Sequence, residues 1–320
     1  MQKKKLLFLC PNIFGLYDVF KTGLENYSGC EVTTILYRRY KYKNKKEQIQ
    51  NFLSKAFSGK KLKNQWEEEM YLDLLKEYKH FDYALTICPE MLSAPVLSHV
   101  QQIADKSVVY YWDGFDHFPN YRQTLPYFDS LFSFDPEDAK KYKLNFITNF
   151  YFAENRNTKA TLDFFFLSSF DSRYPVLEKI VSLLEKQQMK VSVLQYVNDK
   201  KLKLIPKKHL QSFEFITKPI SFKETTELMD KARIVLDIQK DIQKGLTFRV
   251  FEAMGLGKKL ITTNPEIVNY DFYNPNNIFI WTDETKTIPE SFLNTPYVEI
   301  SEEIYKKYSQ ESWVKKILDL

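Results

Sequence analysis

The stretch that decides the fold runs from Ala232 to Asn264 and reads ARIVLDIQKDIQKGLTFRVFEAMGLGKKLITTN. Its apolar start, Ile234 to Ile238, is short and β-branched, which predicts a buried strand. The segment Thr247 to Leu256 has the apolar pattern of a helix, Gly257 suits its left-handed end, and Lys259 to Thr263 predicts a second strand. Strand, helix and strand make a βαβ unit, whose parallel strands require a right-handed crossover.

Several residues of this unit are placed for chemistry. Ligands of open parallel sheets bind at the carboxyl ends of strands, and a helix N-terminus offers free amides to an anion. We expect Thr247 to cap the helix and Gly245 to let the backbone approach a ligand closely. Arg249 and Glu252 share one helix face, where an Arg suits a phosphate and a Glu suits the paired hydroxyls of a ribose. An ordinary surface Arg–Glu pair is the alternative.

The composition limits the classes of protein to consider. A chain of 320 residues is long enough for two domains, and its 44% hydrophobic and 16% aromatic residues can fill sizeable cores. The eight glycines form neither a G-x-G-x-x-G fingerprint nor a Walker-type phosphate loop. The net charge of +5 fits a ligand with phosphates or an anionic membrane surface, and it is far below the level that indicates nucleic acid.

Cysteine usage and hydropathy bear on the compartment. Cys10, Cys30 and Cys88 are scattered, which fits buried thiols in a reducing compartment and neither a disulfide framework nor a zinc site. The apolar run before Pro11 is too short for a targeting segment, and no run approaches the length that crosses a bilayer. We therefore expect a cytoplasmic protein, with peripheral attachment to the inner face of the cell membrane as an open possibility.

The first half of the chain also predicts alternating strands and helices. One expected strand, Ser107 to Trp112, is followed by the sequence WDGFDH, which ends at His117. Carboxylates and an imidazole at the end of a strand are placed for a cleft, so Asp113 is a candidate to accept a proton from a hydroxyl, with His117 as its rival. A turn-forming Asp-Gly pair and a surface histidine are the alternatives.

A second domain is expected to open with the strand Leu162 to Ser168. Serines and Arg173 follow it, and both residue types suit a diphosphate, although Arg173 is also placed to pair with its neighbour Asp171. Further on, Ser221 and Glu224 have the spacing of a capping box.

A basic segment lies within the first half, at residues 38–63. It contains RRYKYKNKK and a later group of lysines, and between them apolar residues recur at helical spacing: Ile49, Phe52, Leu53, Ala56 and Phe57. A basic amphipathic helix can lie on an anionic membrane. A solvated loop and helix is the reading that we favour here, and nucleic-acid binding is a weaker third option.

Two stretches resemble GT-B glycosyltransferases, especially the bacterial CgeB-like and family-4-like groups. GLTFRVFEAMGLGKKLITTN, residues 245–264, resembles their donor-binding segment, and the run from WDGF to YFDSLFSFDPEDAKKY, residues 112–142, resembles a second stretch. The resemblance implies an α/β fold with two Rossmann-like doubly wound domains facing a cleft. It predicts an acceptor-side domain at residues 1–152, a linker at 153–161, a nucleotide-sugar domain at 162–301 and a terminal helix at 302–320 that packs back on the first domain.

The same resemblance implies roles for single residues. Glu252 would hold the nucleotide ribose, the turn from Gly245 to Thr247 would face the diphosphate, and Arg173 would be a better phosphate ligand than Arg249. Many retaining members carry a second glutamate where this chain has Lys244, so inversion or retention stays open. The donor-site candidates are Arg173, Lys244, Gly245, Leu246, Thr247, Arg249 and Glu252. The acceptor-side candidates are Asn12, Phe14 and Tyr17.

The implied activity is transfer of a sugar from a nucleotide-sugar donor to a glycan or lipid-linked acceptor, in bacterial surface polysaccharide or lipopolysaccharide synthesis. No two aspartates stand two apart, and the four histidines lack metal-ligand spacing, so we expect a metal-independent reaction without a cofactor. A sugar-nucleotide epimerase or hydrolase of the same fold and a catalytically silent subunit are the alternatives. Donor sugar, nucleotide base, acceptor, linkage and oligomeric state are not encoded in a readable way.

Overall fold

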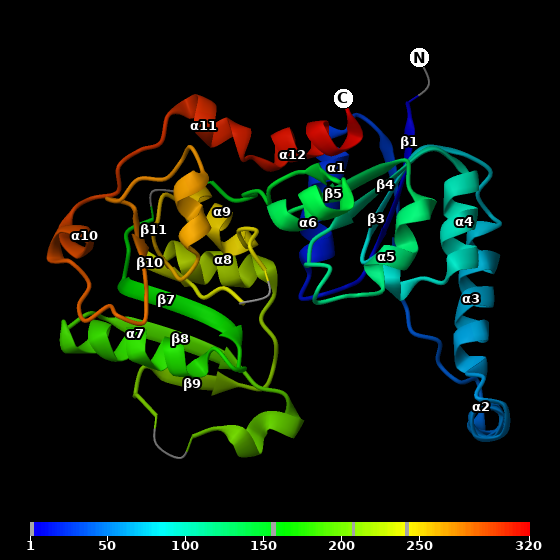
Figure 1. Cartoon of the computed structure of the whole chain (residues 1–320), viewed down its shortest axis with the longest axis horizontal. Helices are drawn as coiled ribbons and strands as arrows, with labels where there is room; N and C mark the ends of the chain where they lie inside the picture. Colours follow the sequence, from blue (N-terminus) through cyan, green and yellow to red (C-terminus); the bar gives the residue numbers. More distant parts are fainter. Residues whose placement is uncertain (1–2, 155–157, 207–208, 241–242) are drawn as a thin grey trace. The chain divides into compact units, whose positions relative to one another are not determined.

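We describe a computed structural model of the chain, in which residues 3–154, 158–206, 209–240 and 243–320 are placed. The chain divides into two compact units (Figure 1). The first comprises residues up to 13, 20–146 and 317–320, and the second comprises 14–19 and 147–316. Among the described helices, none has both the length and the apolar character that crossing a bilayer requires.

The first unit is built on a parallel six-stranded sheet of order β2-β1-β3-β4-β5-β6. Its strands are β1 (Lys5–Cys10), β2 (Glu31–Leu36), β3 (Phe81–Ile87), β4 (Ala104–Tyr111), β5 (Ser130–Ser133) and β6 (Asn145–Phe146). The helices of this half are α1 (Leu16–Tyr27), α2 (Lys45–Ser58), α3 (Leu62–Leu75), α4 (Ala94–Gln102), α5 (Tyr121–Thr124) and α6 (Pro136–Tyr142). The central strands are continuous apolar runs because both faces of a parallel sheet are covered.

The second unit holds another parallel six-stranded sheet, of order β12-β11-β10-β7-β8-β9. Its strands are β7 (Leu162–Ser169), β8 (Val191–Tyr196), β9 (Phe213–Ile216), β10 (Ala232–Asp237), β11 (Lys259–Thr262) and β12 (Ile278–Ile280). The helices are α7 (Tyr174–Lys186), α8 (Phe222–Asp230), α9 (Phe248–Gly255), α10 (Glu290–Asn294), α11 (Glu302–Lys307) and α12 (Gln310–Leu318). Counted from β9, this is the strand order of dinucleotide-binding folds, which reverses between β7 and β10.

The predicted βαβ unit is confirmed as β10, α9 and β11, with Ile234 paired to Lys259 in parallel register. Phe164 and Phe166 of β7 pack on the side of the sheet that α7 covers, and Phe165 packs on the opposite side with α9. Helix α9 lies so close to the chain at Tyr151 that a Cβ added to Gly255 would stand 2.6 Å from the Tyr151 Cβ atom. A larger residue does not fit there.

The end of the chain differs from the single helix predicted for residues 302–320. Two helices, α11 and α12, are separated near Ser309, where the strand-like segment at Tyr151 pairs with it. The Tyr151 amide donates to the Tyr308 carbonyl at 3.1 Å, and the Gln310 amide donates to the Tyr151 carbonyl at 3.0 Å. These bonds take the backbone at the junction out of the helical pattern. Residues 147–152 and most of 302–320 fold with the second unit.

The predicted linker and the three cysteines are the remaining features of the fold. The linker predicted at 153–161 includes residues 155–157, which lie outside the described residues. All three cysteines are buried thiols, as the sequence predicts.

Candidate functional site

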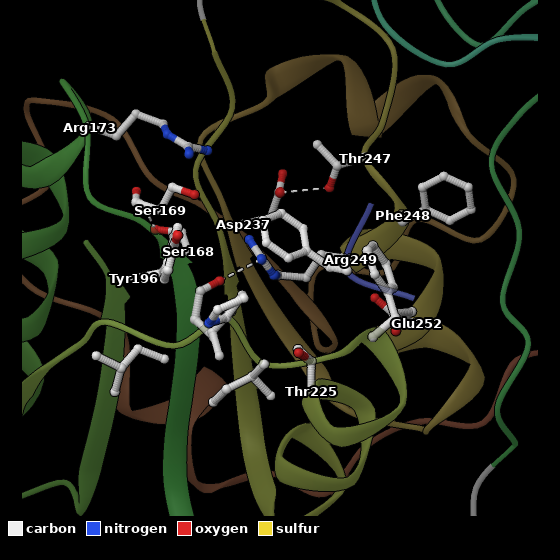
Figure 2. Close-up of a pocket in the computed structure, with 16 residues that line it drawn as sticks. Ser168, Ser169, Arg173, Tyr196, Thr225, Asp237, Thr247, Phe248, Arg249 and Glu252 are labelled. Atoms are coloured by element: carbon white, nitrogen blue, oxygen red, sulfur yellow. Dashed lines mark hydrogen bonds between the residues drawn. The ribbon is translucent and has the colours of Figure 1, made fainter. Parts of the chain in front are cut away.

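A cavity of about 310 Å³ lies within the second unit, at the point where its strand order reverses. The ends of β7, β8, β9 and β10 and the first turns of α8 and α9 surround it (Figure 2). Four donor-site candidates predicted from the sequence line this cavity, namely Arg173, Thr247, Arg249 and Glu252. The fold therefore brings them together at the place where open α/β sheets bind their ligands.

Glu252 is a deeply buried acid of this cavity, with 3% of its surface exposed. Its Oε1 atom lies 2.8 Å from the hydroxyl of Thr226, and that hydroxyl also lies 3.0 Å from the Phe222 carbonyl. Burial raises the pKa of Glu252 to about 7, although the hydrogen bond with Thr226 and the charge of Arg249 act in the opposite direction. A single hydroxyl hydrogen cannot fully satisfy two acceptors, which agrees with a carboxyl group that keeps its proton up to neutral pH.

Arg249, one turn earlier in α9, places its positively charged guanidinium at the same cavity. Figure 2 shows Arg249 among the side chains that line the cavity. Its Nη2 atom donates to the Leu167 carbonyl at 2.6 Å, and the guanidinium lies 4.9 Å from the ring centre of Phe166. Burial lowers the pKa of Arg249, while the charge of Asp237 partly compensates. Within the described part of the chain, Arg249 forms no ion pair, and Glu252 is not on the surface. The alternative of an ordinary surface Arg–Glu pair is therefore wrong.

Arg173 lines the cavity but is already bound by protein groups. Its Nη2 atom lies 2.7 Å from Oδ2 of Asp171, Nε lies 2.9 Å from Oδ1, and Nη1 donates to the Ile238 carbonyl at 2.9 Å. Burial alone would raise the pKa of Asp171, but the hydrogen bonds from Arg173 hold it below its ordinary value. The pairing with Asp171 that the sequence left open is present. Arg249, with one described hydrogen bond, has more donors left for a ligand than Arg173.

Thr247 stands at the N-cap position of α9, but the predicted side-chain cap is wrong. Its hydroxyl donates instead to Oδ1 of Asp237 at 2.8 Å, because Asp237 ends the adjacent strand β10 and presents its carboxylate there. The first turn of α9 is left without a side-chain cap. Its positive end is directed at the cavity that Thr247 and Phe248 line, which favours an anion.

Phe14, an acceptor-side candidate from the sequence, belongs to the second unit and lines the same cavity as the donor-site candidates. Residues 14–19 fold with the second unit, and the Phe14 carbonyl accepts from the Phe222 amide at 2.9 Å. The Phe14 ring meets Tyr196 edge to face, with 6.1 Å between the ring centres, and both residues line the cavity. Tyr17 belongs to the same segment and Asn12 to the first unit, and neither lines the cavity.

Three further donor-site candidates belong to the loop before α9. Lys244 is exposed, and its carbonyl accepts from the Asn264 amide side chain at 3.0 Å. Gly245 and Leu246 are buried, and the Leu246 carbonyl accepts from Nδ2 of Asn149 at 2.9 Å. None of these three lines the cavity. The segment between β10 and α9 includes residues 241 and 242, which lie outside the described residues.

The first unit has its own polar group at the carboxyl end of its sheet. Asp113 follows β4 and is half-buried, whereas His117 is exposed and its ring packs edge-on against Phe118 at 4.5 Å. Glu90 follows the neighbouring strand β3, and its Oε2 atom is buried with no hydrogen-bond partner among the described residues. Burial, helped by the charge of Asp113, raises the pKa of Glu90 to about 7.

Glu90 is a residue that the sequence reasoning missed. The signal was present, because Glu90 comes directly after a buried strand in the same way as Asp113.

Across the described residues, no three His, Cys, Asp or Glu side chains come together in a way that could hold a metal ion.

Comparison with known proteins bears on the fold. No protein-family model matches this chain, and neither does any curated protein sequence. Among solved structures, AviGT4, a glycosyltransferase involved in avilamycin A biosynthesis, is 9% identical with a TM-score of 0.60, over 99% of this chain and 96% of that one. An alpha-glucosyltransferase in complex with UDP-glucose and DNA containing an abasic site is 12% identical with a TM-score of 0.55, over 99% and 95%.

These similarities confirm the fold class. The chain has the α/β fold with two Rossmann-like doubly wound domains that GT-B glycosyltransferases share.

Proposed function

We propose that this protein is a glycosyltransferase that binds a nucleotide-sugar donor in the β7–β10 cavity. The observation that carries the proposal is the pair formed by Glu252 and Arg249. A buried carboxyl and a partly buried guanidinium line one cavity at the switch point of a nucleotide-type sheet, and they form no ion pair with each other. Both groups are available to a ligand that offers hydroxyls and a negative charge.

The chemistry of each side chain determines which part of the donor it would bind. In this proposal, the carboxylate of Glu252 accepts hydrogen bonds from the two ribose hydroxyls, and the guanidinium of Arg249 meets the diphosphate together with the uncapped amides of α9. The edge-to-face pair of Phe14 and Tyr196 offers an apolar wall to a flat group such as the base. Because two similar structures hold UDP or UDP-glucose, a uridine nucleotide is the first donor to test.

We further propose Glu90, with Asp113 as its neighbour, as the acid–base group on the acceptor. A general base works best when its pKa lies near the working pH, and the pKa of Glu90 is about 7. Asp113 and His117 are the candidates that the sequence predicts for this role, and we prefer Glu90 because its Oε2 atom is buried with no hydrogen-bond partner among the described residues. A base of this kind is what an inverting reaction needs. Departure of the nucleoside diphosphate would be assisted by Arg249 and helix amides without a metal.

The finer features of the activity remain part of the proposal. We place the protein among the CgeB-like or family-4-like transferases, in the cytoplasm, acting on a glycan or lipid-linked acceptor of bacterial surface polysaccharide or lipopolysaccharide synthesis. The similar alpha-glucosyltransferase was solved with DNA, so a DNA duplex belongs in the acceptor panel as a competing candidate.

The direct experiment incubates the protein with a panel of sugar nucleotides and measures release of nucleoside diphosphate, with and without acceptors. Release that depends on an acceptor is the expected result. Release without any acceptor would instead identify a hydrolase, and interconversion of the donor sugar would identify an epimerase. Failure to bind any sugar nucleotide in calorimetry would refute the enzyme proposal and favour a silent subunit.

A further inference from the structure

Helix α2 presents its apolar residues to solvent, whereas its partly buried residues are polar: Glu47, Asn51 and Ser54. Ile49, Phe52 and Phe57 are 57%, 68% and 87% exposed, and the helix has no buried residue. Together with Leu53 and Ala56, they recur at intervals of three and four and so share one face. An ordinary surface helix has the reverse orientation, because burial of the apolar face is what holds it to its domain.

The polar face of α2 is what attaches the helix to its unit. Asn51 donates to the Tyr42 hydroxyl at 2.9 Å and accepts from the Lys63 amide at 2.9 Å. Glu47, one turn earlier, accepts from the Tyr40 hydroxyl at 3.0 Å. These bonds fix which face is turned outward, so the exposed apolar face is a property of the folded unit. Figure 1 shows α2 end-on beside the tip of α3, away from the sheet of its unit.

The surroundings of this face are strongly basic. Residues 38–63 contain ten Lys or Arg and one Glu, a net charge of +9. The whole chain has 46 Lys and Arg against 41 Asp and Glu, so all other residues together carry a net charge of −4. None of the ten cations forms an ion pair within the part of the chain that the structure describes. The positive charge of the protein is thus concentrated around one exposed apolar face.

We propose that α2 and the basic segment around it, residues 38–63, form a docking surface for an anionic membrane. An apolar helical face rich in Phe, Leu and Ile enters the boundary between headgroups and acyl chains, and flanking lysines meet anionic headgroups. A nucleic acid would use the lysines and leave the phenylalanines in water. A neutral protein partner would use the phenylalanines and leave the charge without a counterpart. A lipid surface uses both features, and the inference is independent of the proposed transferase activity.

The test is co-sedimentation of the full chain with vesicles of phosphatidylcholine alone and with about a third phosphatidylglycerol. We expect binding only to the anionic vesicles, and weaker binding at about 0.5 M salt, where the Debye length falls to about 4 Å. Phe52→Ser/Phe57→Ser and, separately, Lys45→Gln/Lys46→Gln should each weaken vesicle binding about tenfold or more. Circular dichroism verifies that each variant is folded, and Leu204→Ser, at another exposed apolar position, should bind as the wild type does.

A second measurement reports insertion directly. Because Cys10, Cys30 and Cys88 are buried, Ala56→Cys introduces an accessible thiol on the apolar face of α2 for a polarity-sensitive fluorophore. We expect its emission to shift to the blue on adding anionic vesicles, and the same label at Leu204→Cys to remain unshifted.

Three results would overturn the proposal. The first is an absence of binding to anionic vesicles at low salt. The second is tight binding of a DNA duplex that depends on the lysines and is unaffected by Phe52→Ser/Phe57→Ser. The third is a concentration-dependent dimer in sedimentation velocity that these Phe substitutions abolish, with no vesicle binding, which would identify a second copy of the chain as the occupant.

Discussion

Replacing Glu252 with Gln should make the protein more stable and a poorer binder of its donor. The substitution keeps the shape of the side chain and removes its titration. Burial has moved the pKa of Glu252 from 4.5 to about 7, which corresponds to roughly 3 kcal/mol between the two protonation states. Ionising this group in the folded protein therefore has a cost that the neutral amide does not have.

The sign of the pH dependence follows from the same shift. Between pH 4.5 and about 7 the folded protein retains a proton on Glu252 that the unfolded chain has released, so stability falls as pH rises through this window and levels off above it. In Glu252→Gln this contribution disappears. Urea unfolding at about pH 5 and about pH 8 should show that the variant loses up to about 3 kcal/mol less than the wild type over this interval. Glu90 contributes its own share to the slope in both proteins.

Whereas Glu252→Gln should raise the free energy of unfolding, it should lower the affinity for the donor. An ionised carboxylate can accept from both ribose hydroxyls, whereas an amide has one acceptor, so UDP-glucose affinity should fall about tenfold to a hundredfold in Glu252→Gln at pH above 7. For the wild type, affinity should rise as pH increases through about 7. UDP-glucose is the better probe for this titration, because UDP has a terminal phosphate with its own pKa near 6.

Isothermal titration calorimetry measures this binding, with Glu227→Gln as the matched control. Glu227 lies on the adjoining helix α8, is exposed and does not line the cavity, so its substitution should change neither property. Unchanged UDP-glucose affinity in Glu252→Gln would refute the ribose role. Equal losses in both variants would show that the effect is not specific to the cavity.

Three further substitutions test the remaining assignments. Arg249→Gln should weaken UDP-glucose binding by roughly tenfold to a hundredfold in calorimetry, whereas Arg173→Gln, which orphans Asp171, should chiefly lower the free energy of unfolding; the reverse pattern would contradict the assignment. Glu90→Gln should lower kcat by a factor of about a hundred or more and remove the limb near pH 7 from the pH–rate profile, while donor affinity is retained. Gly255→Ala should cost about 1–3 kcal/mol in urea unfolding, because its Cβ would clash with Tyr151; an unchanged midpoint would contradict that packing.

Most of the fold could be predicted because the strands of a parallel sheet have a recognisable sequence pattern. Its strands are buried on both faces and are therefore continuous apolar runs, as in β1 and β10. Local helix signals were also readable, and the capping box of Ser221 and Glu224 is confirmed by hydrogen bonds in both directions. Each of these features depends on residues close together in the chain.

The features that the sequence did not predict depend on distant partners. The Thr247 hydroxyl donates to Asp237 on strand β10 and does not cap its own helix. The terminal helix is interrupted because Tyr151, far upstream in the sequence, forms backbone hydrogen bonds with Tyr308 and Gln310. Phe14 follows the first strand of the first unit but folds with the second. Periodicity also gives the two faces of α2 without saying which one is turned to solvent. Hydrogen bonds of Asn51 and Glu47 decide that orientation.

The energetics of the cavity explain why Glu252 is a stronger candidate than Arg173, although both were predicted. A buried carboxyl with a single side-chain partner costs free energy, and an apolar residue in the core of α9 would not have this cost. The guanidinium of Arg173, in contrast, already has protein partners, because it donates hydrogen bonds to Asp171 and to the Ile238 carbonyl. A ligand that brings two hydroxyls to Glu252 would supply the missing partners and recover part of that cost on binding. Of these two residues, Glu252 is therefore the one whose hydrogen bonding a donor would improve more.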